Sequence, residues 1–294
     1  MTDGGSQHQT QSVGALSESL GRGGYLADKG TVTALFVAYQ LRRPLFLEGE
    51  AGVGKTELAK VFSQVTGARL IRLQCYEGID ARQALYDWDY ARQMLYIRAL
   101  ESDSVRSTDA IKSVFGRDFL IRRPLLETLE AEEDVVLLID EIDRADDEFE
   151  AFLLELLSDF QVSIPEIGTI RAKRRPMVIL TSNRTREVHD ALKRRCFYHW
   201  IEYPDHDREI AIIRARLPEV SERLAEQVCS AVAQMREMPL RKPPGIGESL
   251  DWVASLAVLG LEELDRDAVQ ISLGAVLKVR EDQERAIAAF TSAH

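Results

Sequence analysis

The stretch Leu45-Phe-Leu-Glu-Gly-Glu-Ala-Gly-Val-Gly-Lys-Thr56 joins an apolar run of strand length to residues with helical spacing. Its part from Gly49 to Thr56 fits the pattern Gly-x4-Gly-Lys-Ser/Thr, which binds phosphate groups when it links a strand to a helix. Glycines let backbone N–H groups turn toward phosphate oxygens, because no Cβ stands in the way. The helix that follows presents its positive N-terminal end to the same anion. The stretch therefore predicts a phosphate-binding loop in an α/β fold.

We expect all eight loop residues to contact the nucleotide; they are Gly49, Glu50, Ala51, Gly52, Val53, Gly54, Lys55 and Thr56. The Lys55 ammonium is expected to reach the β- and γ-phosphates, and the Thr56 hydroxyl is the expected protein ligand of Mg²⁺.

A second motif is Val135-Val-Leu-Leu-Ile-Asp140-Glu141, an apolar run that ends in two adjacent carboxylates. Asp140 is placed to hold Mg²⁺ through its hydration shell, whereas Glu141 is a candidate to polarise the attacking water. Taken alone, such a run also fits an ordinary strand end. The phosphate-binding loop upstream favours the catalytic interpretation.

Asn183 is the single asparagine of the chain and follows the apolar run Met177–Leu180. Its amide is a candidate to orient water beside the γ-phosphate, although asparagine also forms turns. Because Arg184 comes next, the Asn-Lys-x-Asp motif of guanine binding is absent. ATP is therefore favoured over GTP.

Two arginines, Arg194 and Arg195, precede Cys196 and a further apolar run, Tyr198–Ile201. An arginine supplied by a neighbouring subunit can stabilise the charge of phosphoryl transfer. A solvated helix end, where basic side chains complement the helix dipole, is the alternative.

The chain has five apolar runs of strand length, apolar at successive positions, which is typical of a parallel sheet covered by helices on both faces. From Pro204 onward only helical spacing remains. We therefore predict a flexible N-terminal tail (1–24), an α/β core with a five-stranded parallel sheet (25–203) and an all-helical lid (204–294).

The 294 residues carry 37 basic and 48 acidic side chains, for a net charge of −11. This acidic balance argues against a nucleic-acid-binding surface. No run is long enough for a membrane helix and no signal peptide is recognisable. The three cysteines form no metal-binding pattern and fit reduced thiols, so we expect a cytoplasmic protein without stable membrane insertion.

These motifs, in this order, resemble the AAA+ ATPases of the MoxR type, over about Gly24 to Trp252. The resemblance implies Walker A and Walker B roles for the two motifs, sensor 1 for Asn183, and an arginine finger at Arg195, with Arg194 as the rival. It also implies a homo-oligomeric, hexameric ring that uses ATP and Mg²⁺.

Three longer segments resemble the CoxD-like branch, whose members assist carbon monoxide dehydrogenase maturation; they are Leu73–Asp80, Tyr86–Tyr90 and Arg194–Asp205. This resemblance implies a chaperone-like ATPase that acts with a von Willebrand factor A-domain partner on a metalloenzyme client. It leaves open whether metal is inserted, sulfur transferred or an inhibitor removed.

The lid departs from the common pattern of the family, because the stretch Gly247–Leu250 has no sensor-2 arginine. Arg241 or Lys242, just upstream, is the alternative.

Two insertions also stand out in the α/β core. The aromatic residues Tyr86, Trp88 and Tyr90 either grip a partner or simply pack, and Gln161–Thr169 is expected to form a hairpin before sensor 1.

Two other functions compete with a client-remodelling ATPase. A DNA-remodelling AAA+ motor requires a basic groove, against which the charge count speaks. A non-hydrolysing nucleotide switch or scaffold does not need a catalytic acid, yet Glu141 is present.

Overall fold

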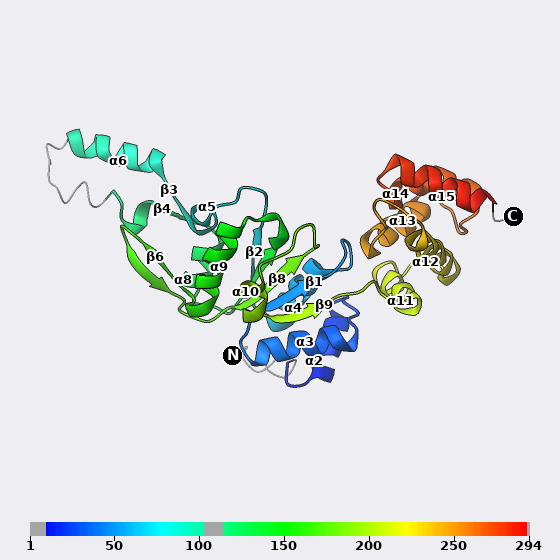
Figure 1. The fold of residues 1–294 in the computed structure, drawn as a ribbon, viewed down its shortest axis with the longest axis horizontal. Coiled ribbons are helices and arrows are strands. Elements are labelled where there is room, and N and C mark those ends of the chain that lie inside the picture. Colours follow the sequence, from blue (N-terminus) through cyan, green and yellow to red (C-terminus); the bar gives the residue numbers. More distant parts are fainter. Residues whose placement is uncertain (1–9, 103–113, 293–294) are drawn as a thin grey trace.

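The computed structural model describes residues 10–102 and 114–292, and its centre is a five-stranded parallel sheet (Figure 1). The strand order is β2-β5-β8-β1-β9. The strands are β1 (Leu45–Glu48), β2 (Arg69–Gln74), β5 (Val135–Asp140), β8 (Met177–Ser182) and β9 (Phe197–Trp200). All neighbouring pairs are parallel, so the predicted five-stranded parallel sheet is confirmed.

Every residue of the three central strands, β5, β8 and β1, is buried. Alternate residues point to opposite faces and join two separate apolar clusters. On one face, Leu45 and Leu47 pack with residues of α2 (Val13–Arg22), α3 (Lys29–Gln40) and α4 (Lys55–Thr66). On the other, Leu137 and Ile139 pack with residues from further helices; these are α5 (Ala81–Leu85), α8 (Pro124–Glu130), α9 (Asp147–Asp159) and α10 (Asp190–Arg195). Two buried faces explain the uninterrupted apolar runs.

The prediction of a flexible tail over residues 1–24 is wrong for the part that forms α2. Ser12 caps this helix, and Leu16 and Leu20 are fully buried beside α3 and α4. The polar composition concealed the helix, because two leucines one turn apart are enough to form its buried face. Residues 1–9 lie outside the described part of the chain.

Two small antiparallel sheets extend from the core. One pairs β3 (Tyr86–Trp88) with β4 (Leu120–Arg122), and α6 (Tyr90–Ser102) follows β3. The other is the predicted hairpin before sensor 1, formed by β6 (Gln161–Ile164) and β7 (Gly168–Arg171). Single turns of 3-10 helix stand at Arg117–Phe119 (η1) and Ile142–Arg144 (η2).

Trp88 packs inside the first of these extensions rather than facing a partner. It is 5% exposed, and its ring lies 5.8 Å from the Tyr86 ring and 5.7 Å from that of Phe115. A gripping role for Trp88 is therefore wrong. Tyr90, at the start of α6, is exposed.

After β9, the described residues form helices only. They are α11 (His206–Arg216), α12 (Glu222–Glu237), α13 (Ile246–Val258), α14 (Arg266–Val276) and α15 (Arg280–Ser292), and they share a cluster around the buried Trp252. This helical unit, called the lid below, lies at the opposite end of the molecule from α6 (Figure 1). The predicted boundary at Pro204 falls in the link between β9 and α11. No helix among the described residues is long and apolar enough to cross a membrane.

Candidate nucleotide site

The loop between β1 and α4 ends at a helix N-terminus that no side chain caps. Gly54 is the N-cap of α4 with φ 95°. Its first N–H groups therefore lack the usual side-chain acceptor and are available to an anion. The Tyr25 ring lies 3.4 Å from the position that a Cβ at Gly54 would take. The ring leaves room for a Cβ in ordinary contact, so it is the left-handed backbone conformation that favours glycine at the position.

Lys55 is held inside the loop that it follows. Its side chain is 5% exposed, and Nζ donates hydrogen bonds to the carbonyl oxygens of Gly49, at 2.8 Å, and Glu50, at 2.7 Å. Burial lowers the pKa of the Lys55 ammonium to about 8, and nearby carboxylates, first Asp143, oppose this shift. A phosphate could replace the two carbonyl acceptors with charged ones, which bind an ammonium more strongly.

Asp140, at the end of β5, meets Thr56 as predicted. The carboxylate is 2% exposed, and Oδ1 accepts hydrogen bonds from the hydroxyls of Thr56, at 2.9 Å, and Thr181, at 2.6 Å. Arg72 Nε donates to Oδ2 at 3.0 Å. A hydroxyl and a carboxylate in contact are the oxygen ligands that Mg²⁺ accepts beside nucleotide phosphates. The sequence analysis missed both Thr181 and Arg72.

Glu141 turns away from Asp140 because its backbone is left-handed, with φ 56° and ψ 52°. This conformation costs a non-glycine residue about 1–2 kcal/mol, and its N–H is held by the Thr181 hydroxyl at 2.9 Å. The carboxylate then accepts from Asn183 Nδ2 at 3.3 Å, Gln74 Nε2 at 3.1 Å and Arg144 Nε at 2.9 Å. The structure thus brings Glu141 and Asn183 together, and adds Gln74 and Arg144.

Asn183 is positioned by a carboxylate that the sequence analysis did not single out. Asp143 is buried in η2, and its oxygens accept from the N–H of Asn183 at 3.2 Å and that of Thr185 at 2.8 Å. The turn after β8 is thereby tied to the turn after β5. The only sequence signal for Asp143 is its position three residues after Asp140.

Arg194 and Arg195 are exposed at the end of α10 and do not line the cavity beside the phosphate-binding loop. The Arg195 guanidinium contacts the Ser158 hydroxyl. Arg43 donates to the backbone carbonyl of Arg194 at 3.1 Å. Within one chain, therefore, neither arginine joins the other predicted site residues.

A cavity of about 520 Å³ lies between the loop and the lid. Besides the loop, its walls include Tyr25, Asp28, Arg208, Ile212 and Ile246. Burial raises the pKa of the Tyr25 hydroxyl, so this group stays neutral. Three contacts join the lid to the cavity walls: Ile246 N–H donates to the Gly52 carbonyl at 3.1 Å, Arg216 pairs with Glu57, and Arg208 Nη1 lies 3.5 Å from Asp28 Oδ2.

The lid approaches the loop at the stretch where a sensor-2 arginine was sought. A Cβ on Gly245 would lie 2.7 Å from Gly52 Cα and 2.9 Å from the Ala51 carbonyl oxygen. Glu248 caps α13 by accepting from Gly245 N–H at 3.1 Å. Arg241 and Lys242 do not line the cavity; their N–H groups donate to Asp282. The lid thus meets the loop backbone to backbone.

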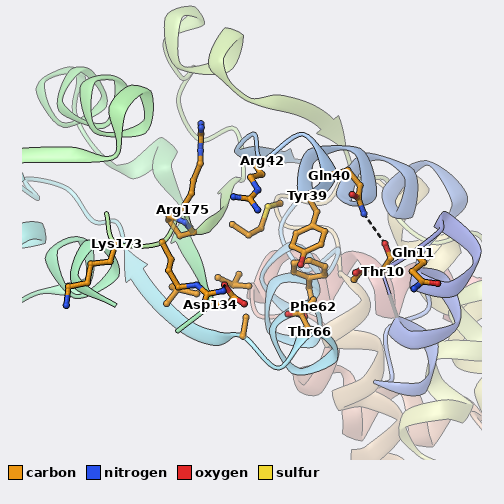
Figure 2. A pocket seen from close by; sticks show the side chains of 16 residues that line it. Thr10, Gln11, Tyr39, Gln40, Arg42, Phe62, Thr66, Asp134, Lys173 and Arg175 are labelled. Atoms are coloured by element: carbon orange, nitrogen blue, oxygen red, sulfur yellow. Dashed lines mark hydrogen bonds and ion pairs between the residues drawn. The ribbon is translucent and has the colours of Figure 1, made fainter. Parts of the chain in front are cut away.

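A larger cavity, of about 900 Å³, contains none of the predicted site residues (Figure 2). It lies where β5 and β8 begin, whereas ligands of parallel sheets bind where strands end. Of its basic residues, Lys173 pairs with Glu132 and Arg174 with Asp134. The smaller cavity is therefore the candidate nucleotide site.

The sheet, the loop after β1 and the helical lid define the fold of an AAA P-loop nucleoside triphosphatase. Residues 44–196, slightly more than half of the chain, match the family described as AAA domain (dynein-related subfamily), and the chain belongs to this family.

Among individual proteins, the chain is similar to the gas vesicle ATPase GvpN of Haloferax mediterranei, with 24% identity over 236 residues. The match covers 76% of this chain and 64% of that protein's length. Among solved structures, the Thermotoga maritima RuvB Holliday junction branch migration motor aligns with 17% identity and a TM-score of 0.46, over 90% of this chain and 71% of that chain. A mutant of the same motor gives a TM-score of 0.49.

Replacing Gly245 by alanine tests the contact between lid and loop. Because the added Cβ would overlap loop backbone, the lid must move, and overpacking of this kind costs about 1–3 kcal/mol. We expect the affinities for ATP and ADP, measured by titration calorimetry, to fall about tenfold. Gly247→Ala is the matched control, since nothing lies within 4 Å of its Cβ. Equal affinities in the two variants would contradict the contact.

Nucleotide affinity is expected to depend on pH above neutrality. The free protein holds Lys55 with a pKa of about 8, and a bound polyphosphate raises this pKa because it favours the charged form. As far as Lys55 governs it, affinity should therefore fall as the pH rises from 7 through 8 toward 9.5. The measurement is the ADP dissociation constant against pH. Lys60→Gln, which removes a lysine of the same helix and cavity, should keep this profile, and Lys55→Gln should flatten it.

Proposed function

We propose that the chain is an Mg²⁺-dependent ATPase of the MoxR type that remodels a client protein. The observation that carries the proposal is the meeting of five predicted residues at one edge of the sheet; they are Lys55, Thr56, Asp140, Glu141 and Asn183. The similarity to a gas vesicle ATPase supports hydrolysis as the activity.

Each residue has a distinct role in the proposed reaction. Lys55 and the N–H groups of the loop bind the phosphates. Thr56 and Asp140 would hold Mg²⁺, which neutralises charge on the phosphates. Glu141 takes the proton of the attacking water, and Asn183 orients that water, since its amide already lies 3.3 Å from the Glu141 carboxylate.

Arg194 or Arg195 completes the site of the next subunit in the proposed ring. Both are exposed and outside the cavity of their own chain, which supports a role in trans. A contact between two different surfaces of the same chain generates a ring when its rotation closes, and we propose a closed hexamer.

The extension that carries α6 supplies a surface for the client. Tyr90, Met94 and Ile97 form a stripe at i, i+4 and i+7, and with Leu95, which is 67% exposed, they leave much apolar surface uncovered. The proposed client is a metalloenzyme of the molybdenum-copper carbon monoxide dehydrogenase type, with a von Willebrand factor A-domain protein as partner. The segments Leu73–Asp80, Tyr86–Tyr90 and Arg194–Asp205 support this branch.

Mixing two inactive variants tests the site and the arginine finger together. Glu141→Gln removes the proposed base of the subunit's own site. Arg195→Ala removes the arginine that acts in the site of the neighbouring subunit. Each variant alone should therefore lose ATPase activity. In a random mixed ring about a quarter of the interfaces join an intact Glu141 to an intact Arg195, because the interface is heterologous. We expect phosphate release to recover to about that fraction.

A second mixture, of Glu141→Gln with Arg194→Ala, decides which of the two arginines is the finger. Failure of both mixtures to recover activity would contradict a finger in trans. Full client maturation by Glu141→Gln alone would favour the non-hydrolysing switch.

The surface of α6 is tested by Leu95→Glu, which places a charge in the apolar patch. In cells that lack the native chain, this variant should fail to restore carbon monoxide dehydrogenase activity, while its ATPase rate stays unchanged. Val258→Glu is the matched control, because Val258 is also apolar and is 88% exposed, but it lies on the lid. If Leu95→Glu restores dehydrogenase activity, the α6 surface does not bind the client. If the dehydrogenase is normally active in cells without the chain, it is not the client.

A further inference from the structure

The turn that carries the two candidate finger arginines, called the finger turn below (Arg194–Cys196), is held by an arginine from a distant part of the chain. Arg43 stands just before β1, and its Nη2 donates to the backbone carbonyl oxygens of Arg194, at 3.1 Å, and Cys196, at 3.2 Å. The carbonyls at the end of a helix lack partners within the helix, and α10 ends at Arg195. Arg195 therefore lies between the two carbonyls that one guanidinium nitrogen holds.

The helix α10 is also attached to the far end of β1. Glu48, the last residue of this strand, is 4% exposed, and its carboxylate accepts from the Tyr198 hydroxyl at 2.8 Å. Lys193 Nζ lies 3.5 Å from the same carboxylate and 5.8 Å from the centre of the Phe46 ring. A buried carboxylate is costly without such partners. Because Lys193 directly precedes the two arginines, residues at both ends of β1 hold the end of α10.

The strand that holds the finger turn also leads into the phosphate-binding loop. Gly49 follows Glu48 directly, and β9, which begins after the finger turn, pairs with β1 along the whole of that strand. Arg43 itself is not among the described residues that line the nucleotide cavity of its own chain. Its side-chain contacts lead to the finger turn, so the loss of Arg43 should leave nucleotide binding by the same chain intact.

We propose that Arg43 is a positioning residue for the site of the neighbouring subunit, because it holds the finger turn where an arginine can reach the nucleotide bound there. This role rests on the proposed function, since it requires an arginine finger in trans. In this role Arg43 touches no nucleotide. Its loss leaves the side chains of Arg194 and Arg195 present but misplaced, and an error of about 1 Å in the position of a catalytic group can lower a rate about a hundredfold.

Arg43→Ala tests this role in a single preparation. We expect the ATPase rate to fall about tenfold, through misplacement of the finger, while the dissociation constant for ADP, measured by titration calorimetry, stays at the wild-type value. Arg43→Lys should recover most of the rate, because an ammonium can also donate to two carbonyls. Arg42→Ala is the matched control and should keep the wild-type rate, since Arg42 is the adjacent arginine but lines the larger cavity (Figure 2).

Mixed rings show in which subunit the loss acts. Arg43→Ala mixed with Glu141→Gln should recover to about a quarter of the wild-type rate, because the Glu141→Gln subunits bring an intact finger turn to intact neighbouring sites. Arg43→Ala mixed with the finger variant, Arg195→Ala or Arg194→Ala, should not recover, since both kinds of subunit then present a defective finger.

The opposite pattern, recovery with the finger variant but not with Glu141→Gln, would place the effect in the site of the same chain and overturn the assignment. Recovery in neither mixture, or an unchanged rate in Arg43→Ala alone, would also overturn it. The mixture of Glu141→Gln with the finger variant is the reference. If that reference stays inactive, the finger in trans is rejected, and the failure then lies in the proposed function rather than in Arg43.

Discussion

The site depends on one buried carboxylate, Asp140, and on the groups that compensate its charge. A carboxylate at the end of a fully buried strand is costly unless hydrogen bonds surround it. Here the compensation comes from three elements: Thr56 from α4, Thr181 from β8 and Arg72 from β2. These bonds fix the ends of neighbouring strands relative to the phosphate-binding loop, and every other feature of the site is built on this arrangement.

Thr181 links the two acidic residues through one hydroxyl. It donates to Asp140 and accepts from the N–H of Glu141, whose left-handed backbone directs the two carboxylates apart. One carboxylate therefore faces the hydroxyl of Thr56, and the other faces the amide of Asn183. Two adjacent residues thereby gain different surroundings, which separates metal binding from water activation in the proposed reaction.

The lid is joined to this arrangement by backbone and by charge rather than by a large apolar interface. Gly245 and Gly52 pack at a distance that admits no side chain, while Arg216 and Arg208 face carboxylates of the core. Close packing tolerates no added atoms, so the position of the lid is sensitive to small changes in the loop. An occupied cavity adds the nucleotide as a further contact between the two parts.

The sequence by itself determined the sheet, the loop and the order of the acidic and amide residues, because each has a local pattern. Continuous apolar runs mark buried strands, and Gly49 to Thr56 and Asp140-Glu141 stand directly at strand ends. The helix α2 and the burial of Trp88 escaped prediction, since composition and aromatic spacing do not reveal what a side chain packs against. Only the tertiary structure decided which residues contact the predicted site residues. Gln74 lies beside Asp140 only through the register of β2 and β5. Gly245 contacts Gly52, although almost two hundred residues separate them in the chain. Contacts between distant segments have no periodic signature, so the sequence gives the chemistry-bearing residues, and the fold selects the groups that hold them.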